Sequence, residues 1–66
     1  MRASINGEPR EIEAGLTIAD LLQQLGAPER GIAIAKNERV VPRSAFADER
    51  IAEGDRIEII QAVAGG

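Results

Sequence analysis

The segment Thr17–Leu25, with the sequence TIADLLQQL, decides the fold class because it carries the clearest helical period in the chain. Its apolar residues recur at i, i+3, i+4 and i+7 and form one stripe: Ile18, Leu21, Leu22 and Leu25. Thr17 is placed to cap the first turn, and Asp20, three residues on, to complete a capping box. Gly26 and Pro28 close the helix. The sequence therefore predicts one short amphipathic helix that must bury a single face.

The residues before this helix predict a β-hairpin. Apolar and polar residues alternate over residues 1–6, which is typical of a half-buried strand. Asn6-Gly7 then favours a tight turn, because both residues tolerate a positive φ. We expect the return strand to run from about Arg10 to Leu16 with three apolar residues on one face: Ile12, Ala14 and Leu16. Pro9 cannot donate a ladder hydrogen bond, so this strand should lie at an edge of the sheet.

Three further strands are predicted after the helix. The first covers residues 32–35, where isoleucine and alanine alternate, and ends at the turn Asn37-Glu38. A brief strand at Val40-Val41 stops before Pro42, and the final strand covers residues 56–60 after the turn Gly54-Asp55. The irregular stretch between them, residues 43–53, contains Phe46 and Ile51, which we expect to anchor it to the core.

This order of elements, β-β-α-β-β-β, predicts an α+β domain of two layers, since the helix can bury its stripe only against one face of the sheet. With the last strand central and parallel to the first, it is the ubiquitin-like β-grasp fold, a mixed sheet of four to five strands packed on one main helix. We expect residues 1–61 to form this domain and residues 62–66 to form a flexible tail. The predicted core consists of Ile5, Ile12, Leu21, Leu22, Leu25, Ile34, Ile57 and Ile59.

Composition excludes several classes of function. The 66 residues include no Cys, His or Tyr, so a disulfide, a zinc site or an ordinary catalytic acid, base or nucleophile is not expected. A net charge of −3 with one lysine and one aromatic residue argues against nucleic-acid binding. The single lysine, Lys36, also argues against a modifier that builds lysine-linked chains. We expect a cytoplasmic protein that has no membrane segment, is a monomer when free and binds other proteins.

The last two residues, Gly65-Gly66, indicate a reactive handle if the carboxyl group of Gly66 is free. Two glycines can pass through a narrow slot because neither has a Cβ. The carboxylate is ionised at neutral pH, so it must be activated, for example as an acyl-adenylate, before a nucleophile attacks it. The alternative is a plain flexible tail or a cloning remnant.

Several short motifs occur in order along the chain: Asn6-Gly7, Thr17-Ile18-Ala19-Asp20-Leu21-Leu22, Gly31-Ile32-Ala33-Ile34-Ala35-Lys36-Asn37, Val41-Pro42-Arg43, Gly54-Asp55 and Val63-Ala64-Gly65-Gly66. With these motifs at family spacing, the chain resembles the ThiS family, the sulfur carriers of thiamine biosynthesis. Two departures are small: Phe46 stands where Trp is frequent, and Lys36 where an aliphatic residue is common.

The resemblance implies a protein substrate and not an enzyme. A ThiF-type adenylyltransferase would adenylate Gly66 with ATP and Mg²⁺, and a persulfide donor would convert the adenylate into a thiocarboxylate. The thiocarboxylate would then donate its sulfur to a ThiG-type thiazole synthase. The chain itself would bind no cofactor and no metal.

The same resemblance assigns roles to residues near the tail. Gly65, Ala64, Val63 and Ala62 would thread into the partner's active site. Ala33 and Ala35 are candidates for a docking face because short side chains permit close approach, with ordinary solvated positions as the alternative. Arg43 either pairs with an acidic partner residue or is simply solvated.

Two other functions remain open from the sequence. One is the small sulfur-carrier subunit of molybdopterin synthase, which is also a β-grasp protein ending in diglycine. The other is a β-grasp module that binds partners non-covalently and whose glycines are incidental. A ferredoxin-type β-grasp is excluded because the chain has no cysteine.

Overall fold

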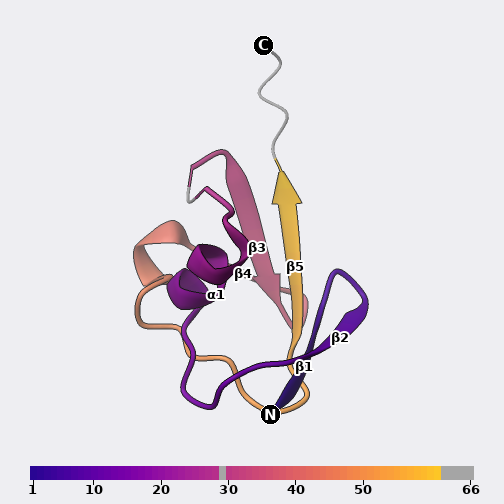
Figure 1. Cartoon of the computed structure of the whole chain (residues 1–66). Helices are drawn as coiled ribbons and strands as arrows, with labels where there is room; N and C mark the ends of the chain where they lie inside the picture. The colour runs from indigo at the N-terminus through magenta and orange to yellow at the C-terminus, as the bar shows by residue number, and fades with distance from the viewer. Residues whose placement is uncertain (29, 62–66) are drawn as a thin grey trace.

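The computed structural model describes residues 1–28 and 30–61, which form a five-stranded sheet and one α-helix (Figure 1). In chain order the elements are β1 (Arg2–Ile5), β2 (Glu8–Glu11), α1 (Ile18–Leu25), β3 (Ile32–Lys36), β4 (Arg39–Val41), the 3₁₀ helix η1 (Arg43–Ala45) and β5 (Arg56–Gln61). The predicted tail, residues 62–66, lies outside the described residues, so the division into domain and tail stays a prediction.

The strand order in the sheet is β2-β1-β5-β3-β4. β1 and β5 are parallel neighbours at the centre, while the β1–β2, β3–β5 and β3–β4 pairs are antiparallel. α1 lies against one face of this sheet, which gives the two layers of the predicted fold (Figure 1). The central, parallel position of the last strand and the edge position of β2 are both confirmed.

The capping signals define the bounds of α1. The Thr17 Oγ1 atom accepts a hydrogen bond from the Asp20 N–H at 3.1 Å, and Asp20 Oδ2 accepts one from the Thr17 N–H at 3.2 Å. At the other end Gly26 has a φ of 68°, and its N–H returns to the carbonyls of the last turn. The helix thus begins and ends where the sequence predicted.

The core is larger than predicted. Leu25 and Ile59 are only partly buried, while the other six predicted residues are buried. Further residues join them: Ala3, Leu16, Ile18, Val41, Phe46 and Ile51. Phe46 and Ile51 each retain only 3% exposure, so the prediction that they anchor the irregular segment is confirmed.

The predicted bounds of the second strand are wrong. Asn6 and Gly7 have φ values of 52° and 85° and form a two-residue turn, so pairing resumes at Glu8, opposite Ile5. The strand stops at Glu11, and a turn with Gly15 at a φ of 84° follows. Ile12 and Leu16 are buried from either side of this turn, while Ala14 is exposed. The apolar residues at positions 12 and 16 therefore belong to the two ends of a turn, both of which contact the core, and not to one face of a strand.

Within the described ranges, no helix has the length and apolar character needed to cross a membrane.

Candidate functional site

The candidate site begins at the C-terminal end of β5, because this strand leads into the predicted tail. β5 pairs with β3 over most of its length, from Ile57 opposite Lys36 to Gln61 opposite Ile32. The tail residues themselves, Ala62, Val63, Ala64, Gly65 and Gly66, lie outside the described residues, so their predicted roles stay untested.

On its other side β5 extends beyond β1. The parallel register joins only Ser4 to Arg56 and Ile5 to Ile57. One more rung follows, in which the Asn6 N–H donates to the Ile57 carbonyl at 2.8 Å and the Ile59 N–H donates to Oδ1 of Asn6 at 2.8 Å. The turn residue Asn6 therefore completes the hydrogen bonding of β5 with its side chain. The sequence predicts only the turn conformation of Asn6; the signal for this second role is its side-chain oxygen, which can accept a hydrogen bond.

A second asparagine, Asn37, forms hydrogen bonds with the residues at the start of β5. Its Oδ1 accepts a hydrogen bond from the Arg56 N–H at 2.9 Å, and its Nδ2 donates to Asp55 Oδ1 at 2.9 Å. The other carboxylate oxygen of Asp55 accepts from the Ala52 N–H at 2.7 Å. Burial acts to raise the pKa of Asp55, but these hydrogen bonds and the nearby Lys36 charge together hold that pKa below its ordinary value.

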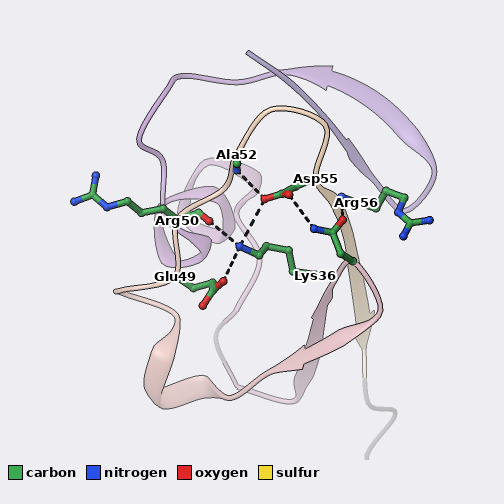
Figure 2. Close-up of polar contacts among 7 residues, drawn as sticks. Lys36, Glu49, Arg50, Ala52, Asp55 and Arg56 are labelled. Atoms are coloured by element: carbon green, nitrogen blue, oxygen red, sulfur yellow. Dashed lines mark hydrogen bonds and ion pairs between the residues drawn. The ribbon is translucent and has the colours of Figure 1, made fainter.

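Lys36 joins this cluster from β3. Its Nζ atom lies 2.6 Å from Glu49 Oε2 and 3.6 Å from Asp55 Oδ2, and it donates to the Arg50 carbonyl at 3.0 Å (Figure 2). The hydrogen bond with Glu49 raises the pKa of Lys36 against the opposing effect of burial, and the charge of Asp55 adds to the increase. Lys36 is opposite the buried Ile57 in the register, so it lies on the helix side of the sheet. Its charge therefore lies on the helix side of the sheet and not on the outer face.

The outer face of the sheet carries a small apolar patch beside the end of β5. Ala33 is opposite Ile60, and Ala35 is opposite Glu58 on one side and Val40 on the other. Val40 is 78% exposed and Ile60 is 57% exposed. We call these residues the outer patch: Ala33, Ala35, Val40 and Ile60.

The outer patch extends the predicted docking face. Ala33 is exposed, as predicted, and Ala35 is half-buried. Val40 and Ile60 are not part of the docking face that the sequence predicts. The signal for them is strand alternation, because Val40 precedes the buried Val41 and Ile60 follows the partly buried Ile59. Arg43, the third predicted docking residue, is exposed but belongs to η1 and not to the sheet.

The described ranges contain no group of three or more His, Cys, Asp or Glu side chains that could hold a metal ion.

A mixed sheet packed on one helix, with its last strand at the centre and leading out beside an apolar patch, defines a ubiquitin-like β-grasp protein. Residues 3–66 match the ThiS family. The chain belongs to the ThiS family, as its motifs indicated.

Similar proteins agree with this membership. The chain is 36% identical over 66 residues to the sulfur carrier protein ThiS of Escherichia coli (strain K12), and each protein is covered completely. It is 38% identical over 66 residues to a thiazole synthase of Paramagnetospirillum magneticum, of which it spans only 20%. The crystal structure of a thiamine biosynthesis protein (ThiS) from Geobacter metallireducens superimposes with a TM-score of 0.87, at 26% identity and complete coverage of both chains.

Proposed function

We propose that this chain is a sulfur carrier protein for thiazole formation in thiamine biosynthesis. The observation that carries this proposal is the family match, which includes the diglycine and extends over the whole of a ThiS sulfur carrier. The β-grasp topology supports it, because the strand that precedes the tail in the sequence, β5, is the central strand of the sheet. We place the carrier in the cytosol as a monomer when free.

The reacting group in this proposal is the carboxylate of Gly66. A ThiF-type adenylyltransferase, using ATP and Mg²⁺, joins it to AMP with release of pyrophosphate, which turns a poor electrophile into an acyl group with a good leaving group. A persulfide donor then displaces AMP, and the carrier ends in a thiocarboxylate. The sulfur must come from outside because the chain has no cysteine.

A ThiG-type thiazole synthase is the proposed sulfur acceptor. The support is that a region similar to this whole chain forms a fifth of the P. magneticum thiazole synthase. Such an arrangement would keep a carrier and its acceptor together. The same observation favours thiazole formation over molybdopterin synthesis as the destination of the sulfur.

Incubation with ATP tests the assignment as carrier. Alone, the protein should neither hydrolyse ATP nor gain AMP, because its composition lacks the usual catalytic groups. With a ThiF-type partner it should gain AMP at Gly66, and with a persulfide donor one oxygen should be replaced by sulfur, as measured by intact mass. ATP turnover by the pure chain would contradict the proposal. Sulfur delivery to a molybdopterin synthase large subunit, but not to thiazole synthase, would favour the alternative carrier.

The outer patch is the proposed docking surface for the activating partner. Ala33→Arg would place a long charged side chain beside Ile60 without entering the core, since Ala33 is exposed. We expect the dissociation constant for the ThiF-type partner to rise by about tenfold or more, which corresponds to about 1.4 kcal/mol. Titration calorimetry measures this effect.

Ala47→Arg is the matched control for Ala33→Arg. Ala47 is also exposed but lies in the turn after η1, outside the sheet. It should bind the partner as the unmodified chain does. If both variants bind equally well, with unchanged thermal melts, the outer patch is not the docking surface.

A further inference from the structure

A carrier whose terminus is activated as an acyl-adenylate can react with amines as well as with the sulfur donor. A free amine can attack an acyl-adenylate: a C–N bond forms, the bond from the acyl carbon to the AMP oxygen breaks, and the amine proton passes to solvent. The product is a stable amide that can no longer accept sulfur. This inference rests on the proposed function, since only an activated Gly66 is at risk.

The chain has a single side-chain amine, that of its one lysine. It has seven arginines and a single lysine, Lys36. An arginine guanidinium stays protonated at all ordinary pH values and is therefore a poor nucleophile. Lys36 is the remaining candidate for attack by a side chain.

Chain length alone does not keep Lys36 away from an activated terminus. Lys36 is opposite Ile57, four residues before Gln61, which corresponds to about 13 Å along a strand. Residues 62–66 can span up to about 17 Å when extended. The terminus of a second carrier molecule has no such limit. Distance alone therefore does not protect the amine.

The Lys36 amine contacts one main-chain carbonyl and two carboxylates. Nζ donates a hydrogen bond to the Arg50 carbonyl at 3.0 Å and forms ion pairs with Glu49 Oε2 at 2.6 Å and with Asp55 Oδ2 at 3.6 Å. The side chain retains 20% exposure. Figure 2 shows that the guanidinium groups of Arg50 and Arg56 point away from this cluster, so they do not compete for its carboxylates.

The main chain around Glu49 is held in place by hydrogen bonds to residues 16 and 18, at the start of α1. The Ile18 N–H, at the start of α1, donates to the Glu49 carbonyl at 2.9 Å. Two residues later the Ile51 N–H donates to the Leu16 carbonyl, also at 2.9 Å. The loop that carries Glu49 is therefore fixed to the residues that precede the helix, and Asp55 is fixed through Asn37 and Ala52.

The main-chain amine of Met1 also has a carbonyl and a carboxylate beside it. Its nitrogen donates to the Ile12 carbonyl at 2.8 Å and lies 3.0 Å from Glu11 Oε2. Each amine that the structure describes thus has a carbonyl and at least one carboxylate oxygen beside it.

We propose that the Lys36 cluster makes the carrier inert toward its own activated terminus, so that sulfur and not a carrier amine accepts the acyl group. Glu49 and Asp55 are positioning residues in this device, because they hold the Lys36 nitrogen protonated and without a free lone pair. The raised pKa of Lys36 is consistent with that state. A role in fold stability alone would require the ion pairs but would not require a slow reaction of the amine.

Competitive acetylation tests the proposal without any partner. The Arg10→Lys variant introduces a reference amine on the exposed edge strand β2, and both lysines are treated with limiting N-hydroxysuccinimidyl acetate at pH 8. Peptide mass spectrometry should show Lys36 reacting several-fold more slowly than the reference amine, because its nitrogen lies between Glu49, Asp55 and the Arg50 carbonyl and its side chain is only 20% exposed. Equal rates would overturn the proposal.

Glu49→Gln, added to Arg10→Lys, identifies the protecting group. It removes the nearest negative charge from Nζ but keeps the side-chain size, so Lys36 should react several-fold faster while the reference amine is unchanged. Circular dichroism and a thermal melt establish that the fold is retained. An unchanged Lys36 rate in this folded variant would overturn the assignment of Glu49.

A second experiment uses a ThiF-type partner and ATP with no sulfur donor. Glu49→Gln should accumulate amide-linked carrier dimers, which a denaturing gel detects. The unmodified chain should form far fewer of these dimers. The double variant Glu49→Gln with Lys36→Arg should form no lysine-linked dimers. Equal dimer yields from the first two would contradict the protective role. Absence of AMP on every variant would count against the proposed function, while the acetylation result would still decide the chemistry of Lys36.

Discussion

One residue added after Gly66 should lower partner-dependent ATP–pyrophosphate exchange by at least about a hundredfold. The added residue moves the reactive carbon by up to about 3.5 Å, and a misplacement of roughly 1 Å in an active site can already cost a hundredfold in rate. The β-grasp domain should keep its fold, because residues 1–61 are unchanged. This prediction rests on the proposed carrier function.

Gly65→Val should produce a similar loss by a different route. A β-branched side chain stiffens the backbone and fills space in a slot shaped for glycine. Arg10→Ala, on the exposed edge strand β2, is the control and should exchange at the rate of the unmodified chain. Circular dichroism establishes that all variants are folded. Normal exchange by both tail variants would favour the non-covalent binding module.

Leu22→Ala should lower the free energy of unfolding by about 2–5 kcal/mol. Leu22 retains only 1% exposure and lies on the stripe of α1 that packs on the sheet. A small domain without disulfides has a total stability of only about 5–15 kcal/mol, and each kcal/mol shifts the melting temperature of a domain this size by about 4–8 °C. The loss should therefore appear as a large fall in the thermal midpoint.

Gln24→Ala is the matched control, since Gln24 is exposed on the same helix. It changes no buried contact and should leave the midpoint within a few degrees of the unmodified chain. A Leu22→Ala midpoint as high as that of the control would mean that the stripe is not the main contact between helix and sheet.

Sequence alone was sufficient where the physical cause is local. The helix bounds follow from a capping box and from Gly26, and the first turn follows from two adjacent residues that tolerate a positive φ. The central position of β5 was also predictable, because a single helix that covers one face of the sheet leaves few ways to connect the strands. Family membership followed from motifs spread over the whole chain.

The end of β2 shows where local reasoning fails. Apolar residues at every second position suit a strand, but Ile12 and Leu16 can also reach the core from the two ends of a turn. Only the packing of the complete chain distinguishes these two arrangements, since both bury Ile12 and Leu16 and they differ at Ala14, which the turn leaves exposed.

The side-chain contacts of the site depend on residues far apart in sequence. Asn6 bonds to Ile59, Lys36 to Glu49, and Asn37 to Asp55. The outer patch likewise forms only because the register sets Ala33 beside Ile60 and Ala35 beside Val40. Sequence by itself determined the elements, their order and the family, because these depend on local conformational preference and on the apolar pattern. The tertiary structure alone decided that the single lysine is enclosed by carboxylates and that two exposed aliphatic side chains border the alanines, because both arrangements require strands and loops to meet in three dimensions.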